Sequence, residues 1–260
     1  MNIRDQIGHD VVLNSTPTRI ISLVPSQSEL LHYLGCEKSM IGITRFCTHP
    51  KELRKNVKII GGTKDLDFEN IKLLKPDLII CNKEENNKKD VLQLQKLYPT
   101  YTSDVNNLTE ALDMISDIGE LTSTKSQSEK LVTKIDEDFK KILNFFSGTV
   151  AYLIWNDPIM LAGQNTFINS NLTLLGFKNI VSETKSRYPE ILESDLNSET
   201  IDYIFLSSEP YPFKEKNKKL FQNKFPQAKV VLVDGRVFSW YGSCLTEVSD
   251  YAKTLTKQLS

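Results

Sequence analysis

Residues 19–35 read Arg-Ile-Ile-Ser-Leu-Val-Pro-Ser-Gln-Ser-Glu-Leu-Leu-His-Tyr-Leu-Gly, and this stretch decides the fold class. Its first six residues form an apolar run of strand length, and the segment from Gln27 to Leu34 carries its leucines on one helical face. Ser26 is the expected N-cap of that helix, with Glu29 completing a capping box, and Gly35 is expected to end it. The stretch therefore predicts a strand that passes directly into a helix.

The same alternation continues along the first half of the chain. Met40–Ile43 is expected to be a second strand. Phe68–Leu74 is expected to be a helix that ends before Pro76, because proline disfavours helical backbone in the residue before it. Asp77–Cys81 follows as a buried strand. Short strands that alternate with helices are typical of a parallel α/β architecture.

Residues 108–146 differ from the segments before them. They contain no proline and a single glycine, Gly119, and apolar residues recur at helical spacing from Leu108 to Ile142. We expect one long helix here, with Gly119 as its one position for a kink. It would span roughly 50–60 Å at about 1.5 Å per residue, which exceeds the width of one small lobe.

The second half of the chain repeats the pattern of the first. Glu69–Cys81 can be laid over Ser194–Leu206, since each segment holds a short helix, an aspartate and then a four-residue apolar strand. Further strands are expected at Val150–Trp155 and Val230–Val233, and a closing helix at Leu245–Leu259. The sequence thus predicts an α/β fold of two Rossmann-like lobes, residues 1–107 and 147–260, bridged by one long helix over 108–146.

The composition argues against several classes of function. With 32 basic and 33 acidic residues, the 260-residue chain has a formal net charge of −1, which favours neither a nucleic-acid nor an anionic-membrane partner. No stretch approaches the ~20 apolar residues of a membrane span. Met1–Thr18 is polar, so we expect no signal peptide there. The protein is expected to be a monomer.

Sequence motifs for metal binding and catalysis are missing. Four scattered cysteines form no C-x-x-C pair, and with only three histidines a zinc site is not expected. The cysteines are interpreted as apolar fillers or isolated thiols, with a single bridge left open. They are Cys36, Cys47, Cys81 and Cys244. Gly61-Gly62 is interpreted as a turn, because no phosphate-loop motif follows it. We therefore expect no catalytic residue, no metal and no enzymatic activity.

His49 lies in the segment Phe46-Cys-Thr-His-Pro50, which follows an expected strand. Ligands of open α/β sheets bind at the carboxyl ends of strands, so His49 is placed to contact one. Cys47, two residues away, could form a Cys–His nucleophile pair with it, but nothing else in the sequence marks an activated thiol.

Aromatic side chains gather in the loops that follow the expected strands of the second half. Each ring could simply pack within its own lobe. Clusters at equivalent strand ends instead favour the walls of a ligand site, because Trp and Tyr combine broad apolar area with a polar group. The residues expected to bind ligand are His49, Trp155, Arg187, Tyr188, Glu209, Phe238, Trp240 and Tyr241.

Four stretches resemble the helical-backbone (class III) solute-binding proteins of ABC importers, which include the periplasmic cobalamin receptor and the receptors for ferric siderophores and haem. These stretches are residues 19–31, Leu34-Gly-Cys36, Gly42-Ile-Thr44 and Lys75-Pro-Asp-Leu-Ile-Ile80. The resemblance runs from about Asp5 to the C-terminus. It implies two lobes bridged by one long helix, a ligand in the cleft between the lobes and no intrinsic cofactor.

The resemblance also implies a ligand. Tyr188 matches an aromatic residue that lines the ligand site of the cobalamin receptor, whereas His49 replaces such an aromatic and could pack on a macrocycle or coordinate its metal. A corrinoid such as cobalamin is the expected ligand. A ferric siderophore or haem is the alternative, although a siderophore receptor would more often carry further basic residues beside Arg45 and Arg187. A cytoplasmic cofactor-processing enzyme on the same fold is an alternative from another class.

The partners that the resemblance implies are the membrane subunits of an importer. Members of this family dock through one surface carboxylate on each lobe, which pairs with arginines of those subunits. Glu69 matches the first carboxylate, and the second position falls at Ser194, between Glu193 and Asp195. The family works outside the cytoplasm, in periplasmic or membrane-anchored form.

Overall fold

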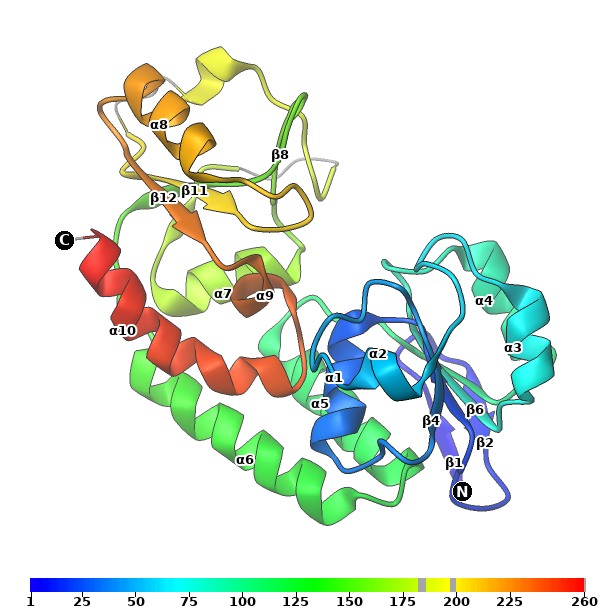
Figure 1. Ribbon diagram of the computed structural model, residues 1–260. Coiled ribbons are helices and arrows are strands. Elements are labelled where there is room, and N and C mark those ends of the chain that lie inside the picture. Colours follow the sequence, from blue (N-terminus) through cyan, green and yellow to red (C-terminus); the bar gives the residue numbers. More distant parts are fainter. Residues whose placement is uncertain (182–185, 197–199, 260) are drawn as a thin grey trace. The chain divides into compact units, whose positions relative to one another are not determined.

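The computed structural model describes residues 1–181, 186–196 and 200–259 and confirms the α/β class (Figure 1). The chain divides into two compact units. Unit 1 contains Met1–Val105, Thr109–Lys134 and Tyr241–Cys244, and unit 2 contains chiefly Ile135–Trp240 and the C-terminal segment from Leu245. None of the helices in the described ranges combines the length and the apolar character that a membrane span requires.

A five-stranded parallel sheet forms the centre of unit 1. Its strands are β3 (Ile20–Ser22), β4 (Met40–Ile43), β5 (Lys58–Ile59), β6 (Leu78–Asn82) and β7 (Thr100–Ser103). They lie in the order β5-β4-β3-β6-β7, with every neighbouring pair parallel. A hairpin of β1 (Asn2–Arg4) and β2 (Asp10–Val12) precedes them. The three apolar runs expected as strands are therefore neighbours, with β3 in the middle.

The helices of unit 1 begin with α1, which differs at its start from the expectation. They are α1 (Pro25–Tyr33), α2 (Leu53–Asn56), α3 (Phe68–Leu74) and α4 (Lys88–Gln95). The capping box predicted for Ser26 and Glu29 is wrong, because Val24 is the N-cap and Pro25 opens the helix. The fixed φ of proline suits the first helical position. Glu29 instead accepts a hydrogen bond from the Ser243 hydroxyl at 2.9 Å.

The C-terminal end of α1 is the one that the sequence predicts. Gly35 takes the left-handed conformation, with φ of 86°. Its N–H donates to the carbonyl of His32 at 3.0 Å, and the N–H of Cys36 donates to Leu31 at 2.9 Å. This pair of hydrogen bonds is a Schellman motif, which satisfies the last carbonyls of the helix.

Residues 108–146 form two helices instead of the single one expected. α5 (Leu108–Leu121) ends before Thr122–Thr124, and α6 (Lys125–Ile142) begins after it. Ser123 is left-handed, with φ of 57°, and the Thr122 hydroxyl donates to the carbonyl of Ile118 at 2.7 Å, so the polar residues close α5. Gly119 does not kink a helix. A β-carbon there would lie 2.0 Å from Ser128 Oγ, so glycine allows α6 to approach α5 closely.

Unit 2 contains a second sheet with helices around it. Its strands are β8 (Thr149–Asn156), β9 (Ile159–Leu161), β10 (Lys178–Asn179), β11 (Tyr203–Ser207) and β12 (Lys229–Val233). The order is β10-β8-β11-β12 with parallel pairing, and β9 pairs antiparallel with β8. The helices are α7 (Phe167–Leu175), α8 (Glu215–Lys224), α9 (Gly235–Ser239) and α10 (Val248–Leu259), with short 3-10 turns η1 (Glu193–Leu196) and η2 (Ser243–Glu247).

The two segments that repeat in the sequence, Glu69–Cys81 and Ser194–Leu206, make the same kind of contact. In each unit an aspartate before a strand hydrogen-bonds to the backbone at the start of the neighbouring strand. Asp77, before β6, accepts the N–H groups of Thr18 (2.8 Å) and Arg19 (2.9 Å), and its own N–H donates to the Arg19 carbonyl at 3.0 Å. Asp202, before β11, accepts the N–H of Thr149 at 2.6 Å and donates to the Thr149 carbonyl at 3.0 Å. Each aspartate thus fixes its strand against the neighbouring one, β6 against β3 and β11 against β8.

Replacing either aspartate with alanine should lower the free energy of unfolding by about 1–3 kcal/mol, because a backbone N–H loses a charged acceptor. Asparagine should distinguish the two sites. Asp77 uses both carboxylate oxygens, and an amide has only one oxygen, so Asp77→Asn should destabilise more than Asp202→Asn. Urea unfolding of the four variants measures this. Equal losses for both asparagine variants would contradict it.

Candidate ligand-binding site

In each unit, the loops at the carboxyl ends of the parallel strands are the expected place for a ligand. In unit 1 two buried asparagines fix these loops. Asn82 donates to the Ser103 carbonyl at 3.1 Å, and its own side-chain oxygen accepts the N–H groups of Glu84 (2.8 Å) and Glu85 (3.0 Å). Asn86 donates to Leu23 at 3.3 Å. The loops after β3 and β6 are therefore cross-linked to each other and to β7.

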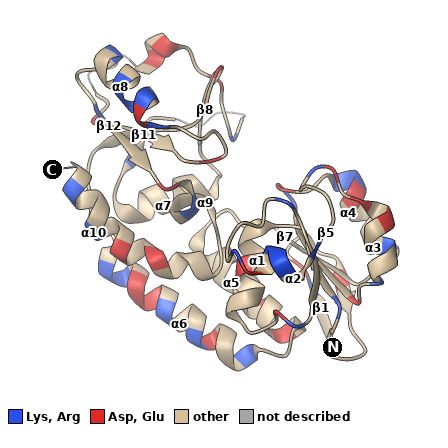
Figure 2. Ribbon diagram, in the orientation of Figure 1, with Lys and Arg blue, Asp and Glu red and all other residues tan. Residues whose placement is uncertain are grey.

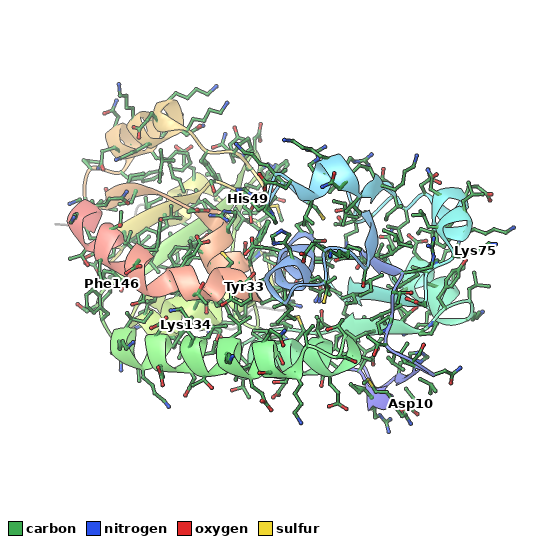
Figure 3. The ribbon with its side chains drawn as sticks, turned by 60° about the horizontal axis from the view of Figure 1, so that its bottom comes forward. Asp10, Tyr33, His49, Lys75, Lys134 and Phe146 are labelled. Carbon is green, nitrogen blue, oxygen red and sulfur yellow. The ribbon has the colours of Figure 1, made fainter. Side chains whose placement is uncertain are left out.

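His49 lies in the loop after β4, where the sequence places it (Figure 3). It is half-buried, and its Nδ1 lies 3.1 Å from the Thr48 hydroxyl. Cys47 is fully buried, and its sulfur lies 3.1 Å from the Ser28 hydroxyl. Burial raises the pKa of the Cys47 thiol, which is the opposite of what an activated nucleophile needs. The Cys–His pair therefore finds no support.

Phe46 in the same loop is a candidate that was not singled out from the sequence. Its side chain is 51% exposed, and the Arg45 guanidinium lies 5.6 Å from the ring centroid. Arg45 also forms an ion pair with Asp65. Gly62 lies beside them, and a β-carbon there would lie 2.8 Å from the end of the Arg45 side chain, which would have to move. The Gly61-Gly62 turn thus lies next to an exposed aromatic ring.

Trp155 is an exposed ring at a strand end of unit 2. It lies near the end of β8 with 39% of its surface exposed, and its indole N–H donates to the Asp157 carbonyl at 3.0 Å. The ring packs edge-on against Tyr211, with 5.6 Å between centroids. This hydrogen bond and ring contact hold an aromatic face toward solvent at a strand end.

Glu209 follows β11 and holds two side chains of α9. It accepts hydrogen bonds from the Ser239 hydroxyl at 3.0 Å and from the Trp240 indole at 2.7 Å. The Arg236 guanidinium lies 5.8 Å from the centroid of the Trp240 ring. Burial raises the pKa of Glu209 despite these two hydrogen bonds. The structure therefore brings Glu209 and Trp240 together, as members of one polar cluster.

Two predicted site residues lie elsewhere. Phe238 is 1% exposed and packs edge-on against Tyr152 at 5.3 Å and Tyr251 at 6.0 Å, so its ring belongs to the core of unit 2 and we leave it out of the proposed site. Tyr241 is buried and belongs to unit 1, in the segment that Ser243 attaches to α1. The structure thus assigns Tyr241 to unit 1 and not to the second lobe, and its contact with a ligand stays a prediction.

Arg187 and Tyr188 are both half-buried, just after residues 182–185, which lie outside the described chain. The Arg187 carbonyl accepts the N–H of Gly163 at 2.8 Å, and the Tyr188 N–H donates to the Ser186 hydroxyl at 3.3 Å. The first of these bonds ties the segment to the strand region after β9. Their contact with a ligand stays a prediction.

The three carboxylates expected at the importer have different surroundings. Glu69 is exposed in the first turn of α3. Glu193 forms an ion pair with Lys224 at 2.7 Å, and Asp195 accepts the N–H of Leu192 at 2.9 Å. Glu193 and Asp195 thus already have intramolecular roles, and their docking function stays a prediction, as does that of Glu69.

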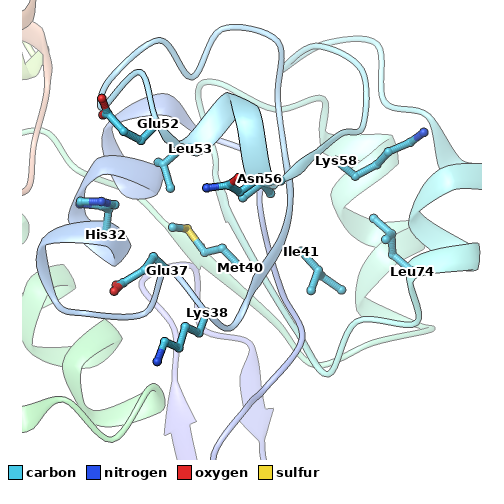
Figure 4. A pocket seen from close by; sticks show the side chains of 11 residues that line it. His32, Glu37, Lys38, Met40, Ile41, Glu52, Leu53, Asn56, Lys58 and Leu74 are labelled. Carbon is cyan, nitrogen blue, oxygen red and sulfur yellow. The ribbon is translucent and has the colours of Figure 1, made fainter.

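Among the residues that the structure describes, no group of His, Cys, Asp and Glu side chains is arranged to hold a metal ion. One cavity of about 600 Å³ lies in unit 1, at the amino ends of β4 and β5 (Figure 4). Met40, Leu53 and Val57 form its apolar floor, and charged side chains surround it. It includes none of the predicted ligand residues, and within the sheet of unit 1 it lies at the edge opposite to the one that carries His49.

Glu209 makes folding stability depend on pH in a defined direction. Because its folded-state pKa is raised, the folded protein binds more protons than the unfolded chain between the ordinary and the raised value, so stability should fall as pH rises through that window. Glu209→Gln should remove this fall, and the exposed Glu247→Gln should not. Urea unfolding between about pH 4 and 7 measures it. A constant difference between wild type and Glu209→Gln over this range would contradict the assignment.

Comparison with known proteins gives relatives that are named as binding proteins. A family model described as periplasmic binding protein matches residues 20–230. The chain is 27% identical to an ABC transporter substrate-binding lipoprotein of Bacillus subtilis over 195 residues, which are 70% of this chain and 62% of that protein. It is 22% identical to the vitamin B12-binding protein of Photorhabdus laumondii, over 95% of this chain and 90% of that protein.

Solved structures share the fold over nearly the whole chain. The periplasmic vitamin B12-binding protein of Vibrio cholerae superposes with a TM-score of 0.79 and 18% identity, covering 94% of this chain and 98% of that one. A possible iron-binding, periplasmic solute-binding protein of Staphylococcus epidermidis gives 0.77 and 23%, covering 94% and 99%. With the family model spanning both sheets, this chain belongs to the periplasmic binding protein family.

Proposed function

We propose that this protein is the solute-binding component of an ABC importer and that it captures a corrinoid of the cobalamin type. The relatives named above are substrate-binding or vitamin B12-binding proteins, which supports the first part. The observation that carries the second part is the charge at the strand ends. Three basic side chains that stand there are paired with carboxylates of the same unit.

Three such basic residues have acidic partners. Arg45, after β4, pairs with Asp65. Lys83, after β6, pairs with Asp104 at 2.5 Å. Arg236, after β12, pairs with Asp234 at 3.2 Å and also approaches Glu247. An anionic chelate would have to displace these partners, whereas the amide side chains of a corrinoid require hydrogen bonds and no countercharge.

The aromatic rings support a ligand with a broad apolar face. Trp155 and Phe46 are both large, exposed and at strand ends, each held by a contact of its own ring or indole. Exposed aromatic side chains held in place lose little conformational entropy when a flat ligand stacks on them. We propose Trp155 and Tyr188 of unit 2 and Phe46 of unit 1 as stacking residues, and the hydrogen-bonded pair of Glu209 and Trp240 as a polar element of the site in unit 2.

Haem or another iron chelate is the second candidate, and His49 is the observation that favours it. A half-buried imidazole in the loop after β4 could supply an axial ligand to iron or to cobalt. The proposed partner in either case is the membrane part of an importer, with Glu69 as the docking carboxylate of unit 1, and the proposed location is outside the cytoplasm.

Cyanocobalamin should bind one-to-one, with a dissociation constant from roughly nanomolar to low micromolar. Titration calorimetry with cyanocobalamin, haem and a ferric siderophore side by side tests this. Heat from haem alone would move the assignment to the second candidate. If none of the three binds, the corrinoid and iron-chelate proposals both fail.

Trp155→Ala should weaken corrinoid binding by about 1–3 kcal/mol, the range expected for a stacking aromatic residue. Trp155→Phe should restore most of the affinity, since it keeps a ring. Tyr33→Ala removes a ring that is 50% exposed at the C-terminal end of α1, the end of that helix that does not follow the carboxyl end of β3, and it serves as the matched control (Figure 3). Equal losses for Trp155→Ala and Tyr33→Ala would exclude Trp155 from the site.

A further inference from the structure

Helix α8 carries a concentration of positive charge that the net charge of the chain conceals (Figure 2). Lys214 is its N-cap, and Lys216, Lys218 and Lys219 follow in the first turns, with Glu215 as the one acidic residue of the helix. None of these four lysines has an ion pair in the described chain. Lys224, at the other end, pairs with Glu193 at 2.7 Å.

This placement of charge opposes the stability of the helix. The N-terminus of a helix is the positive end of its dipole, so cations there are unfavourable and acidic residues are favoured. Here the N-terminus is stabilised by an uncharged group, since the Asn217 side chain accepts the N–H of Lys214 at 3.0 Å. The four lysines at this end therefore do not stabilise α8. A role in binding a partner outside the chain explains them better.

The exposed side of α8 also carries a leucine. Asn217 and Phe221 are the buried residues of the helix, and Phe221 packs in the core of unit 2. Lys216, Lys219 and Leu220 stand three and four positions apart, so they share one face. Leu220 is 48% exposed. An exposed leucine beside two lysines is able to contact a charged lipid interface, where the apolar side chain meets the acyl boundary and the cations meet the headgroups.

We propose that the basic face of α8, formed by Lys216, Lys219 and Leu220, contacts an anionic lipid surface. The lysines meet the phosphates of the headgroups and Leu220 enters the boundary of the acyl chains. This inference rests on the proposed function in one respect, because a solute-binding component of an importer works beside a membrane. Such a contact would hold the protein near its importer without occupying the carboxylate used for docking.

Flotation with lipid vesicles tests the proposal on the whole chain. The protein should associate with vesicles that contain phosphatidylglycerol, associate little with phosphatidylcholine alone, and dissociate at high salt. Lys216→Gln with Lys219→Gln should reduce partitioning by about 30-fold, since each lysine near an anionic surface contributes about fivefold. Leu220→Ser should also weaken association. Lys88→Gln with Lys89→Gln, at the exposed start of α4 in unit 1, is the matched control and should have no effect.

Two further measurements distinguish a lipid contact from unfolding of the variants and from binding of a soluble polyanion. Removing lysines from the start of α8 should leave the midpoint of thermal unfolding unchanged or raised, so a lost association with a lowered midpoint would point to unfolding and overturn the proposal. A heparin column tests for a soluble polyanion. If heparin retains the protein through the same lysines while Leu220→Ser leaves vesicle association unchanged, the surface is a general polyanion site and the lipid proposal fails.

The vesicle experiment does not depend on whether the protein binds a corrinoid. Vesicle association is measured without corrinoid, and the lysine variants should bind cyanocobalamin as wild type does. Wild-type protein that associates with anionic vesicles but binds no chelate would refute the proposed function and leave the lipid contact standing. Wild-type protein that binds cyanocobalamin but shows no preference for phosphatidylglycerol would refute the lipid contact alone.

Discussion

Parallel strands have no hairpin to set their register, so something else must fix where each begins. In this protein the aspartate before a central strand does so, by exchanging hydrogen bonds with the backbone of the residue that starts the neighbouring strand. Asp77 and Arg19 form this pair in unit 1, and Asp202 and Thr149 form it in unit 2. Once the amino ends are aligned, the carboxyl ends also align, and the loops that could hold a ligand emerge at one edge of each sheet.

Most of the fold follows from local sequence, because apolar runs and turn residues act over a few positions. The strands β3, β4, β6, β8, β11 and β12 and the Gly35 end of α1 could be predicted in this way, whereas the edge strands β5, β7 and β10 and the antiparallel β9 were not predicted. The break between α5 and α6 could not. Helical spacing of apolar residues resumes after Thr122–Thr124, but the left-handed Ser123 and the Thr122 hydroxyl bonded to Ile118 end α5 there. Gly119 then leaves room for Ser128 of α6, a close approach that exists only when the two helices pack. Proline at the first position of α1 likewise prevailed over a plausible capping box.

The candidate site was harder to predict, because the sequence gives the position of a loop but not the direction of its side chains. Neighbouring residues in one aromatic segment have different surroundings: Phe238 packs in the core, Trp240 bonds to Glu209, and Tyr241 belongs to the other unit. Phe46 could have been found by applying the same rule to the first half, since it also follows a strand. Two of the three ion pairs at the strand ends, Arg45 with Asp65 and Lys83 with Asp104, join residues about 20 positions apart, and no local pattern indicates them.

The buried thiols have a consequence for how this protein tolerates its surroundings. Cys36, Cys47 and Cys81 are all inside unit 1, and burial raises the pKa of each, that of Cys81 to about 12. Thiol–disulfide exchange proceeds through the exposed thiolate, which is scarce at such sites. The folded chain should therefore be indifferent to the redox poise of its compartment at these positions. The unfolded chain should instead be susceptible to thiol oxidation, because the same cysteines are then accessible to oxidants and to one another.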